Sequence, residues 1–485
     1  MASSTMTAGA SGVPSPDGEE ADRLLDNGDF VKVWSGETIS LVGTQVTQLA
    51  LPLVAIFTLK ATPFDIGLLN ASRYIPVVVV SLFAGVWLDR RRRRPILIAS
   101  NLGRAVLIGL IPLCSALGVL SIWLLCLLCV VTGVLTVIFD VGLLSYMPGL
   151  VERRQLAEAN SKLQTSWSLA GIVGPGLGGL LIGLVTAPVT MIIDAVSFLL
   201  SALSLMAVRT PEPEPAQAHE RTAMWPSIKE GLATVFSSPL LRALLTQSAT
   251  FNLFYNALTT VFLVYAVRYL GMSALQLGLV VGSMSVGALI GAFFNRRVTP
   301  RVGLGRMLRV NTLCVALFPL LLAVPHGHGI VTMAILMGSQ FCYGINLVVY
   351  NVNTVTLRQI VTPNRLLARM NASYRLLLFG TVPIGAVFGG TLGEVFGLRS
   401  AMVITVVTMM SPIIWTFFSP VFDLEKMPDP VADDAPASTT AEPPLIPAAA
   451  ADALPSEDLV EMLSDRSPVA GVGAAAPRSS VENHD

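Results

Sequence analysis

The chain contains little charge. Lysine, arginine, aspartate and glutamate make up 13% of its 485 residues and cancel to a net charge of zero, whereas an ordinary soluble domain is about 25% charged. With no net charge there is no overall field to attract nucleic acid, so we expect no nucleic-acid partner. No Ser/His/Asp, metal or cofactor constellation is present, and no phosphate-binding Gly-x-x-x-x-Gly-Lys motif. These absences argue against an enzyme and against ATP as the energy source.

Cysteine is also scarce. All five cysteines lie inside apolar runs, and the one Cys-x-x-Cys, at Cys126 and Cys129, has no second pair of ligands. We therefore expect small buried helix residues, with no disulfide, no metal site and no bound cofactor.

Long hydrophobic runs are what the chain has in abundance. It is 53% hydrophobic, with a mean hydropathy of +0.69. Runs near 20 residues recur, which is the length that spans a hydrocarbon core of roughly 30 Å. The sequence predicts an all-α membrane protein with twelve transmembrane helices: 32–58, 64–89, 95–118, 121–147, 161–185, 189–208, 241–267, 273–297, 307–325, 329–357, 369–394 and 399–421.

Polar segments divide these runs. The segment 209–239 is the longest polar gap between them and splits them six and six. We therefore expect bundles at 30–208 and 240–422, a cytoplasmic linker at 209–239, and disordered terminal segments at 1–29 and 423–485. Basic residues crowd the alternate connections, as at 90–94 and 296–309, while the others hold only Lys60, Arg268 and Arg399. The positive-inside rule then places both termini in the cytoplasm. We expect a multi-pass protein of the plasma (inner) membrane, with a monomer as the default for such a fold.

The two sets of six runs are related by a repeat. A shift of 211 residues brings Gly67 onto Gly278, and it brings Gly178-Gly179 onto Gly389-Gly390. The same gapless offset holds across more than 100 residues of each half. It predicts two six-helix bundles related by an axis along the membrane normal, with a substrate site between them near the midplane.

Two motifs resemble those of the major facilitator superfamily. The stretch "GVWLDRRRRR" is similar to its Gly-x-x-x-Asp-Arg-x-Gly-Arg-Arg signature between spans 2 and 3, with matches at Gly85, Asp89, Arg90, Arg93 and Arg94. The stretch "AGIVGPGLGG" resembles the span 5 motif of its antiporters, with matches at Gly174, Pro175, Gly178 and Gly179. Further stretches such as "VIFDVGLLSYMPGLVERRQLAEAN" are similar to the drug:H+ antiporter-3 branch, which includes macrolide and siderophore exporters.

The resemblance implies roles for both motifs. Asp89, with Arg90, is expected to meet the start of span 11 and close the cytoplasmic gate, where a helix N-terminus favours a carboxylate. The alternative is that the arginines only set the membrane topology. The Gly174-Pro175 segment is expected to let span 5 bend and pack closely as a leak-tight pivot. Ordinary packing of small residues is the alternative there.

Ionisable residues inside spans are costly and usually functional. Asp140 in span 4 and Arg104 in span 3 lie at similar depth. Asp140 is therefore either a carboxyl that carries protons or half of a permanent structural pair with Arg104. Glu37, near the inner end of span 1, is a further candidate for proton coupling and could also reach toward water.

Substrate-binding candidates follow from the resemblance, which implies that spans 1, 4, 7 and 10 line the cavity. Their polar residues suit an amphipathic, largely apolar organic molecule. The candidates are Gln45, Gln48, Asn252, Tyr255, Asn256, Tyr343, Asn346 and Asn351.

The sequence thus favours proton-coupled efflux of a hydrophobic or amphipathic organic compound, with the proton gradient as the energy source and the lipid bilayer as surroundings. Two alternatives stay open. One is uptake by a facilitator or symporter of the same fold. The other is a membrane scaffold or sensor that acts through its C-terminal tail.

Overall fold

The structure, a computed structural model, describes residues 24–88, 91–212, 224–327 and 329–418. Asp89, Arg90 and the two predicted disordered segments, apart from residues 24–29 of the first, lie outside the described residues. Within the described part every regular element is a helix, and twelve helical segments are long and apolar enough to cross a membrane. The predicted all-α membrane fold with twelve spans is confirmed.

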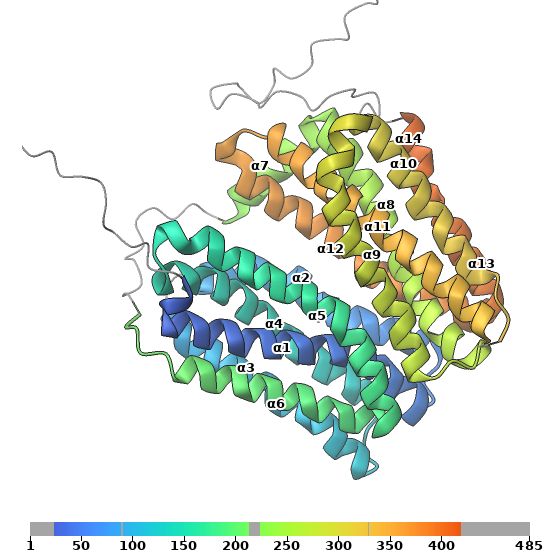
Figure 1. The fold of residues 1–485 in the computed structure, drawn as a ribbon, viewed down its shortest axis with the longest axis horizontal. Coiled ribbons are helices and arrows are strands. Elements are labelled where there is room, and N and C mark those ends of the chain that lie inside the picture. The colour runs from blue at the N-terminus through green and yellow to red at the C-terminus, as the bar shows by residue number, and fades with distance from the viewer. Residues whose placement is uncertain (1–23, 89–90, 213–223, 328, 419–485) are drawn as a thin grey trace, which may run out of the picture. The chain divides into compact units, whose positions relative to one another are not determined.

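The first six spans are α1 to α6, called here the first half (Figure 1). They are α1 (Gly28–Leu53), continued by the π-helical turn Val54–Thr58, then α2 (Pro63–Leu88), α3 (Arg93–Ala116), α4 (Ile122–Leu150), α5 (Leu156–Leu184) and α6 (Ala187–Met206). Short 3₁₀ turns occur at Leu24–Asp26 and Arg153–Gln155.

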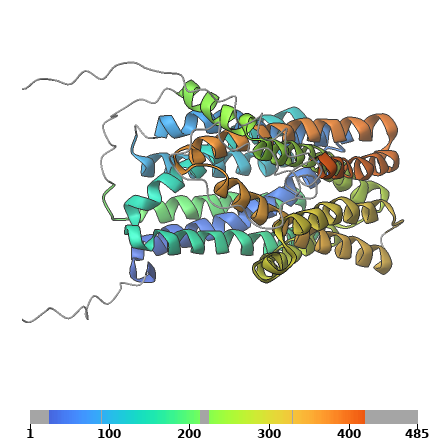
Figure 2. The same cartoon turned by 90° about the horizontal axis from the view of Figure 1, so that it is seen from above.

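The remaining spans form the second half, α8 to α14. They are α8 (Pro239–Val264), continued by the π-helical turn Tyr265–Tyr269, α9 (Ala274–Val302), α10 (Leu304–Leu317) with the 3₁₀ turn Phe318–Ala323, α11 (Ile330–Ile360), α12 (Asn364–Phe396), and the last span made of α13 (Leu398–Thr408) and α14 (Ser411–Phe418). Figures 1 and 2 show the long helices of each half lying side by side along roughly one direction.

The repeat offset of 211 residues is confirmed by the helix boundaries. α1 and α8, α2 and α9, α3 and α10, and α6 and α13 each begin 211 residues apart. The turns agree as well, because the backbone two residues beyond each π-helical turn has a positive φ, 53° at Lys60 and 71° at Gly271. Each turn is followed by a reciprocal capping pair, Thr62 with Asp65 and Ser273 with Gln276. The two halves therefore share the same backbone arrangement at these helix starts and turns.

The two halves cross at two glycine contacts related by the repeat. We call the end where α1 begins the inner end and the end where it finishes the outer end. Toward the outer end, Gly67 of α2 lies against Gly390 of α12, and Gly278 of α9 lies against Gly179 of α5. At each contact an added Cβ would lie about 3.1 Å from the partner's Cα. Because glycine has no side chain, the backbones of the two halves are in direct contact at these points.

Polar contacts also join the halves near the outer end. The Arg268 guanidinium donates to the Ala61 carbonyl at 2.7 Å, and the Asn70 amide donates to Thr260 Oγ1 at 3.1 Å. The largest cluster of buried apolar side chains includes Leu53 and Ile56 of the first half and Val261 and Tyr265 of the second. The outer end is therefore packed closed.

The linker predicted at 209–239 contains an additional helix, α7 (Met224–Ser237). It packs on the first turns of α12 (Figure 1), with Gly231 against the Arg369 carbonyl and Glu230 in an ion pair with the Arg369 guanidinium. Val235 is fully buried beside Met370 and Tyr374. This part of the linker therefore belongs structurally to the second half.

Candidate functional site

A cavity of about 290 Å³ lies among the helices of the first half. Its wall is formed by α1, α2, α3, α4 and α6, and one residue of α12, Arg375, completes it. Most of the wall is apolar. The charged residues on it are Arg73, Asp140, Asp194 and Arg375, so this cavity is more charged than the sequence predicts.

Asp140 is the accessible carboxylate of the cavity. It is exposed on the wall, whereas its neighbour Phe139 is buried. It stands ten residues before the end of α4 at Leu150, which places it about 15 Å from the inner end at 1.5 Å per residue. Gln48 of α1 lines the same cavity. The structure therefore brings together one proton-coupling candidate and one substrate-binding candidate.

Three charged residues in this region are buried: Asp194 on the cavity wall, and Glu37 and Arg104 outside the lining. Glu37 is 8% exposed, Arg104 4% and Asp194 1%. One side-chain atom of each, Glu37 Oε2, Arg104 Nε and Asp194 Oδ2, has no hydrogen-bond partner among the described residues. Arg104 interacts electrostatically with both acids and with Asp140. Because Glu37 is buried, the suggestion that it reaches toward water is wrong.

Arg104 is fixed by its surroundings. Its guanidinium lies 4.1 Å from the ring centre of Phe139 and 4.3 Å from that of Phe198, and it donates to the Asn101 side chain. Two such cation–π contacts compensate in part for burying the charge. The structure records no hydrogen bond or ion pair between Arg104 and Asp140, so the two interact at longer range. The predicted permanent pair is not formed here.

The other substrate-binding candidates do not line this cavity. Asn252 donates to the Leu378 carbonyl at 2.9 Å, and Asn256 and Asn346 donate to carbonyls one turn back on their own helices at 2.7 and 2.8 Å. These amides satisfy the backbone of their own half. That they contact substrate stays a prediction.

The remaining candidates have different surroundings. Tyr255 stacks on Tyr343 with ring centres 5.5 Å apart, and Tyr343 is buried. Gln45 packs against Gly174 on α5, and Asn351 is exposed on α11. Their proposed role in binding also stays untested by this geometry.

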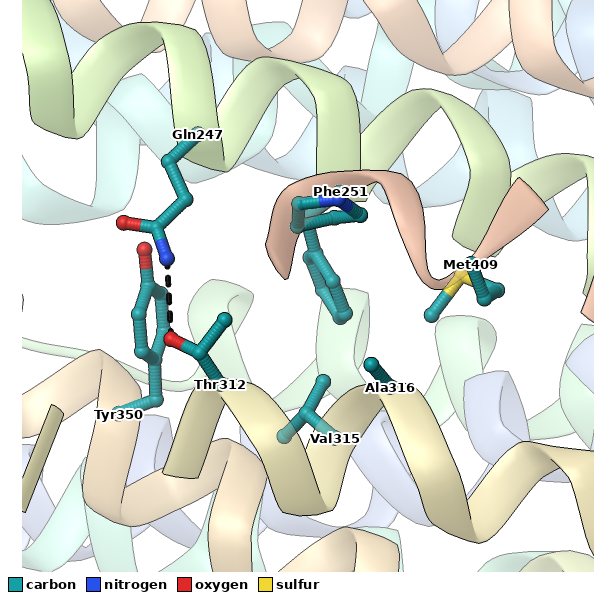
Figure 3. Close-up of a pocket in the computed structure, with 8 residues that line it drawn as sticks. Gln247, Phe251, Thr312, Val315, Ala316, Tyr350 and Met409 are labelled. Carbon is teal, nitrogen blue, oxygen red and sulfur yellow. Dashed lines mark hydrogen bonds between the residues drawn. The ribbon is translucent and has the colours of Figure 1, made fainter. Parts of the chain in front are cut away.

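The second half contains a much smaller cavity between α8, α10 and α11 (Figure 3). Gln247 lies on one side of it and donates to Thr312 Oγ1 at 2.9 Å. The rest of the lining is Phe251, Val315, Ala316, Tyr350, Met409 and Pro412. Its volume of about 10 Å³ holds no more than about one water molecule. In this arrangement the second half offers no room there for an organic substrate.

The described part of the gate motif binds the end of α6. Arg94 donates through Nε and one terminal nitrogen to the carbonyls of Leu205 and Met206, at 3.0 and 2.9 Å. Glu212 then accepts from the backbone N–H groups of Arg93 and Arg94, at 2.5 and 3.1 Å. A carboxylate at a helix N-terminus is favoured. An added Cβ at Gly85 would meet nothing within 4 Å.

The antiporter motif forms two faces of α5. Gly174 and Gly178 pack on α1, where an added Cβ would meet Gln45 Cβ at 2.3 Å and Val46 Cα at 3.3 Å. Gly179 packs on α9, and the carbonyl of Pro175 lies against Gly278 there. The motif therefore joins the two halves. The same contacts are also expected from ordinary packing of small residues, so both interpretations stay open.

Arg375 is the residue that sequence reasoning missed. Its charge is typical of the basic inner connections, yet it stands 11 residues into α12. A signal was present in the sequence, since Arg375 lies within the predicted span 369–394.

Comparison with known proteins agrees with this geometry. The family model of the Major Facilitator Superfamily matches residues 33–380. The multidrug efflux pump Tap of Mycolicibacterium fortuitum is 26% identical over 376 residues, which are 74% of this chain and 87% of the relative. The enterobactin exporter EntS of Salmonella typhimurium is 26% identical over 380 residues, 75% of this chain and 85% of the relative.

Solved structures show the same fold at lower identity. The nucleoside transporter NupG superposes with a TM-score of 0.66 at 11% identity, over 81% of this chain and 98% of that one. A bacterial homologue of the iron transporter ferroportin in its inward-facing state gives 0.59 at 18% identity, over 81% and 99%. With a family model that matches most of its length, this chain belongs to the Major Facilitator Superfamily of membrane transporters.

Proposed function

We propose that this transporter exports hydrophobic or amphipathic organic compounds in exchange for protons, by alternating access between its two halves. The inner end then faces the cytoplasm, because the basic residues crowd there and favour that side. Both termini are cytoplasmic and the protein resides in the inner membrane. Asp89 and Arg90 would contribute to closing the inner end in the opposite state.

The observation that carries the proposal is the exposed carboxylate of Asp140 on the wall of a mid-depth cavity. An ionisable group at this depth is costly and is kept where it has a use. Since Asp140 lies on the cavity surface, a proton can reach it from whichever side the cavity opens. With the outer end packed closed, that side is the inner one.

The rest of the wall supports an amphipathic substrate. Leu51, Ile108, Ile111 and Phe198 line the same cavity as Gln48 and several threonines, and an apolar surface that carries placed polar groups is typical of sites for organic molecules. Efflux is supported by the two relatives described above, a multidrug efflux pump and an enterobactin exporter.

The test uses liposomes that contain a pH-sensitive dye and the purified full chain. A proton gradient is imposed, and lipophilic antibiotics and dyes, a macrolide among them, are added in turn. Wild type is compared with Asp140→Asn. Glu394→Gln is the matched control, because it removes one exposed carboxylate near the outer end of α12.

We expect compound-dependent proton movement in wild type and in Glu394→Gln, and its loss in Asp140→Asn. Movement that persists in Asp140→Asn would exclude Asp140 as the carrier and direct attention to Glu37. Absence of proton movement with every compound would contradict antiport itself.

A further inference from the structure

The large cavity is built almost wholly by one half of the transporter. Its lining residues come from α1, α2, α3, α4 and α6, and the second half contributes Arg375 alone. Arg375 also interacts electrostatically with Asp140 across the boundary between the halves. These two residues are therefore opposite charges that belong to different halves and move with them.

Arg375 is placed to meet Asp140. It stands 11 residues from the start of α12 at Asn364, or about 16 Å from the inner end, close to the depth of about 15 Å worked out for Asp140. Its side chain is exposed, and its guanidinium carbon lies 5.7 Å from the ring centre of Phe379. No ion pair joins it to an acid among the described residues, so its charge is available to Asp140.

The other charges near Asp140 belong to its own half. They are Glu37 on α1, Arg73 on α2, Arg104 on α3 and Asp194 on α6. When the halves rock as rigid bodies, the distances among these residues and Asp140 stay constant. The distance from Asp140 to Arg375 changes.

We propose that Arg375 is the positioning residue that converts the protonation of Asp140 into a change of state. The proposal rests on the proposed function. An ionised Asp140 attracts Arg375 and draws α4 and α12 together, which closes the inner side of the cavity. A protonated Asp140 loses that attraction, and the inner ends separate. Low pH therefore favours the arrangement with an open inner side, and high pH favours its closure.

The direction suits an exporter. A proton taken up at the outside returns the protein to the state that collects substrate from the inside. Release of the proton there restores the attraction and favours the opposite state. Arg104 cannot supply this effect, because it is locked between Phe139 and Phe198 in the same half as Asp140.

The experiment measures the distance between the inner ends as a function of pH, without any transported compound. Spin labels are placed at Ser161→Cys on α5 and Gln359→Cys on α11, both exposed, in an active background that lacks the five native cysteines. Pulsed electron–electron double resonance is recorded on protein in lipid nanodiscs. Arg375→Gln, Arg375→Lys, Asp140→Asn and the double variant Asp140→Asn/Arg375→Gln are compared.

In wild type and Arg375→Lys we expect the ratio of open to closed populations to change with pH by about 5- to 150-fold, the usual range of coupling between sites. Arg375→Gln and Asp140→Asn should each abolish the change, and the double variant should equal the single ones. Arg365→Gln is the matched control, since Arg365 is an exposed arginine in the first turn of α12 outside the cavity. It should behave as wild type.

A pH response in Arg375→Gln equal to that of wild type would overturn the inference, as would a wild type with no pH response. If in addition Asp140→Asn loses proton movement in liposomes, the proposed function survives and only the role of Arg375 is rejected. If Asp140→Asn retains compound-dependent proton movement, the proposed carrier fails first. Equal thermal unfolding midpoints show that the variants are folded.

Discussion

The glycine contacts at the outer end yield a prediction with a matched control on the same helix. An alanine at Gly179 of α5 would place its Cβ 2.5 Å from the Ala274 carbonyl oxygen and 3.0 Å from Leu275 Cα. Both neighbours are backbone atoms of the second half, so no flexible side chain can move aside. We expect Gly179→Ala to push α5 and the start of α9 apart and to disfavour the arrangement with a closed outer end.

The size of the effect follows from overpacking. Insertion of an extra carbon into a filled contact costs about 1–3 kcal/mol. If the cost falls on the outer-closed state alone, the ratio of the two states changes by about 5- to 150-fold. Gly176→Ala on the same helix meets nothing within 4 Å and should change nothing.

The assay is a distance measurement between spin labels at exposed outer-end positions, Leu184 on α5 and Ile330 on α11. Gly179→Ala should lengthen the distance, and Gly176→Ala should match wild type. The repeat supplies an independent second case, in which Gly390→Ala clashes with the Pro63 carbonyl at 2.7 Å while Gly380→Ala meets open space. Indistinguishable distributions for a test variant and its control would refute the argument.

Three further predictions concern stability, each checked by the thermal unfolding midpoint in detergent. Gly271→Ala should lower it, because φ of 71° costs a residue with a Cβ about 1–2 kcal/mol, while Gly329→Ala at φ −67° should not. Asn353→Ala removes bonds to Asn295 Oδ1 at 3.1 Å and to the Val349 carbonyl at 2.9 Å and should cost about 0.6–2 kcal/mol; an unchanged midpoint would show that the amide adds nothing. Glu212→Gln removes the carboxylate from the start of α3 and should cost about 0.3–2 kcal/mol, a loss that should shrink in high salt.

The fold was predictable because the bilayer constrains it so strongly. A span must be apolar and near 20 residues long. It must also be helical, because no water in the bilayer core can pair with its backbone N–H and C=O groups. The repeat was visible because its glycines lie where backbones touch, as at Gly179 and Gly390, and no larger side chain fits there. The π-helical turns at 54–58 and 265–269 had no such signal, because no residue type demands that geometry.

The site was predicted less well, and Arg375 shows why. A charged residue near the end of a span can belong to the connection or to the wall of a cavity. Only the position at which α12 begins, Asn364, decides between the two. Asn252 shows the converse problem. Its amide was a reasonable cavity candidate, yet helix rotation turns it toward the Leu378 carbonyl. Rotation is set by packing among all the helices, which local sequence does not encode.

Comparison of the halves separates what the repeat preserves from what it has lost. The helix starts, the turns and the glycine contacts recur at 211 residues, and these elements hold the halves together. The charges inside the first-half spans do not recur. At the same offset the second half places uncharged residues opposite Glu37, Arg73, Arg104, Asp140 and Asp194, namely Ser248, Met284, Val315, Asn351 and Thr405. The two bodies therefore share one frame for rocking, while the groups able to exchange a proton are concentrated in the first. The second half lacks such groups, so it needs a charge of its own to respond to the protonation of Asp140. Among the residues that line the described cavity, Arg375 is the one from the second half.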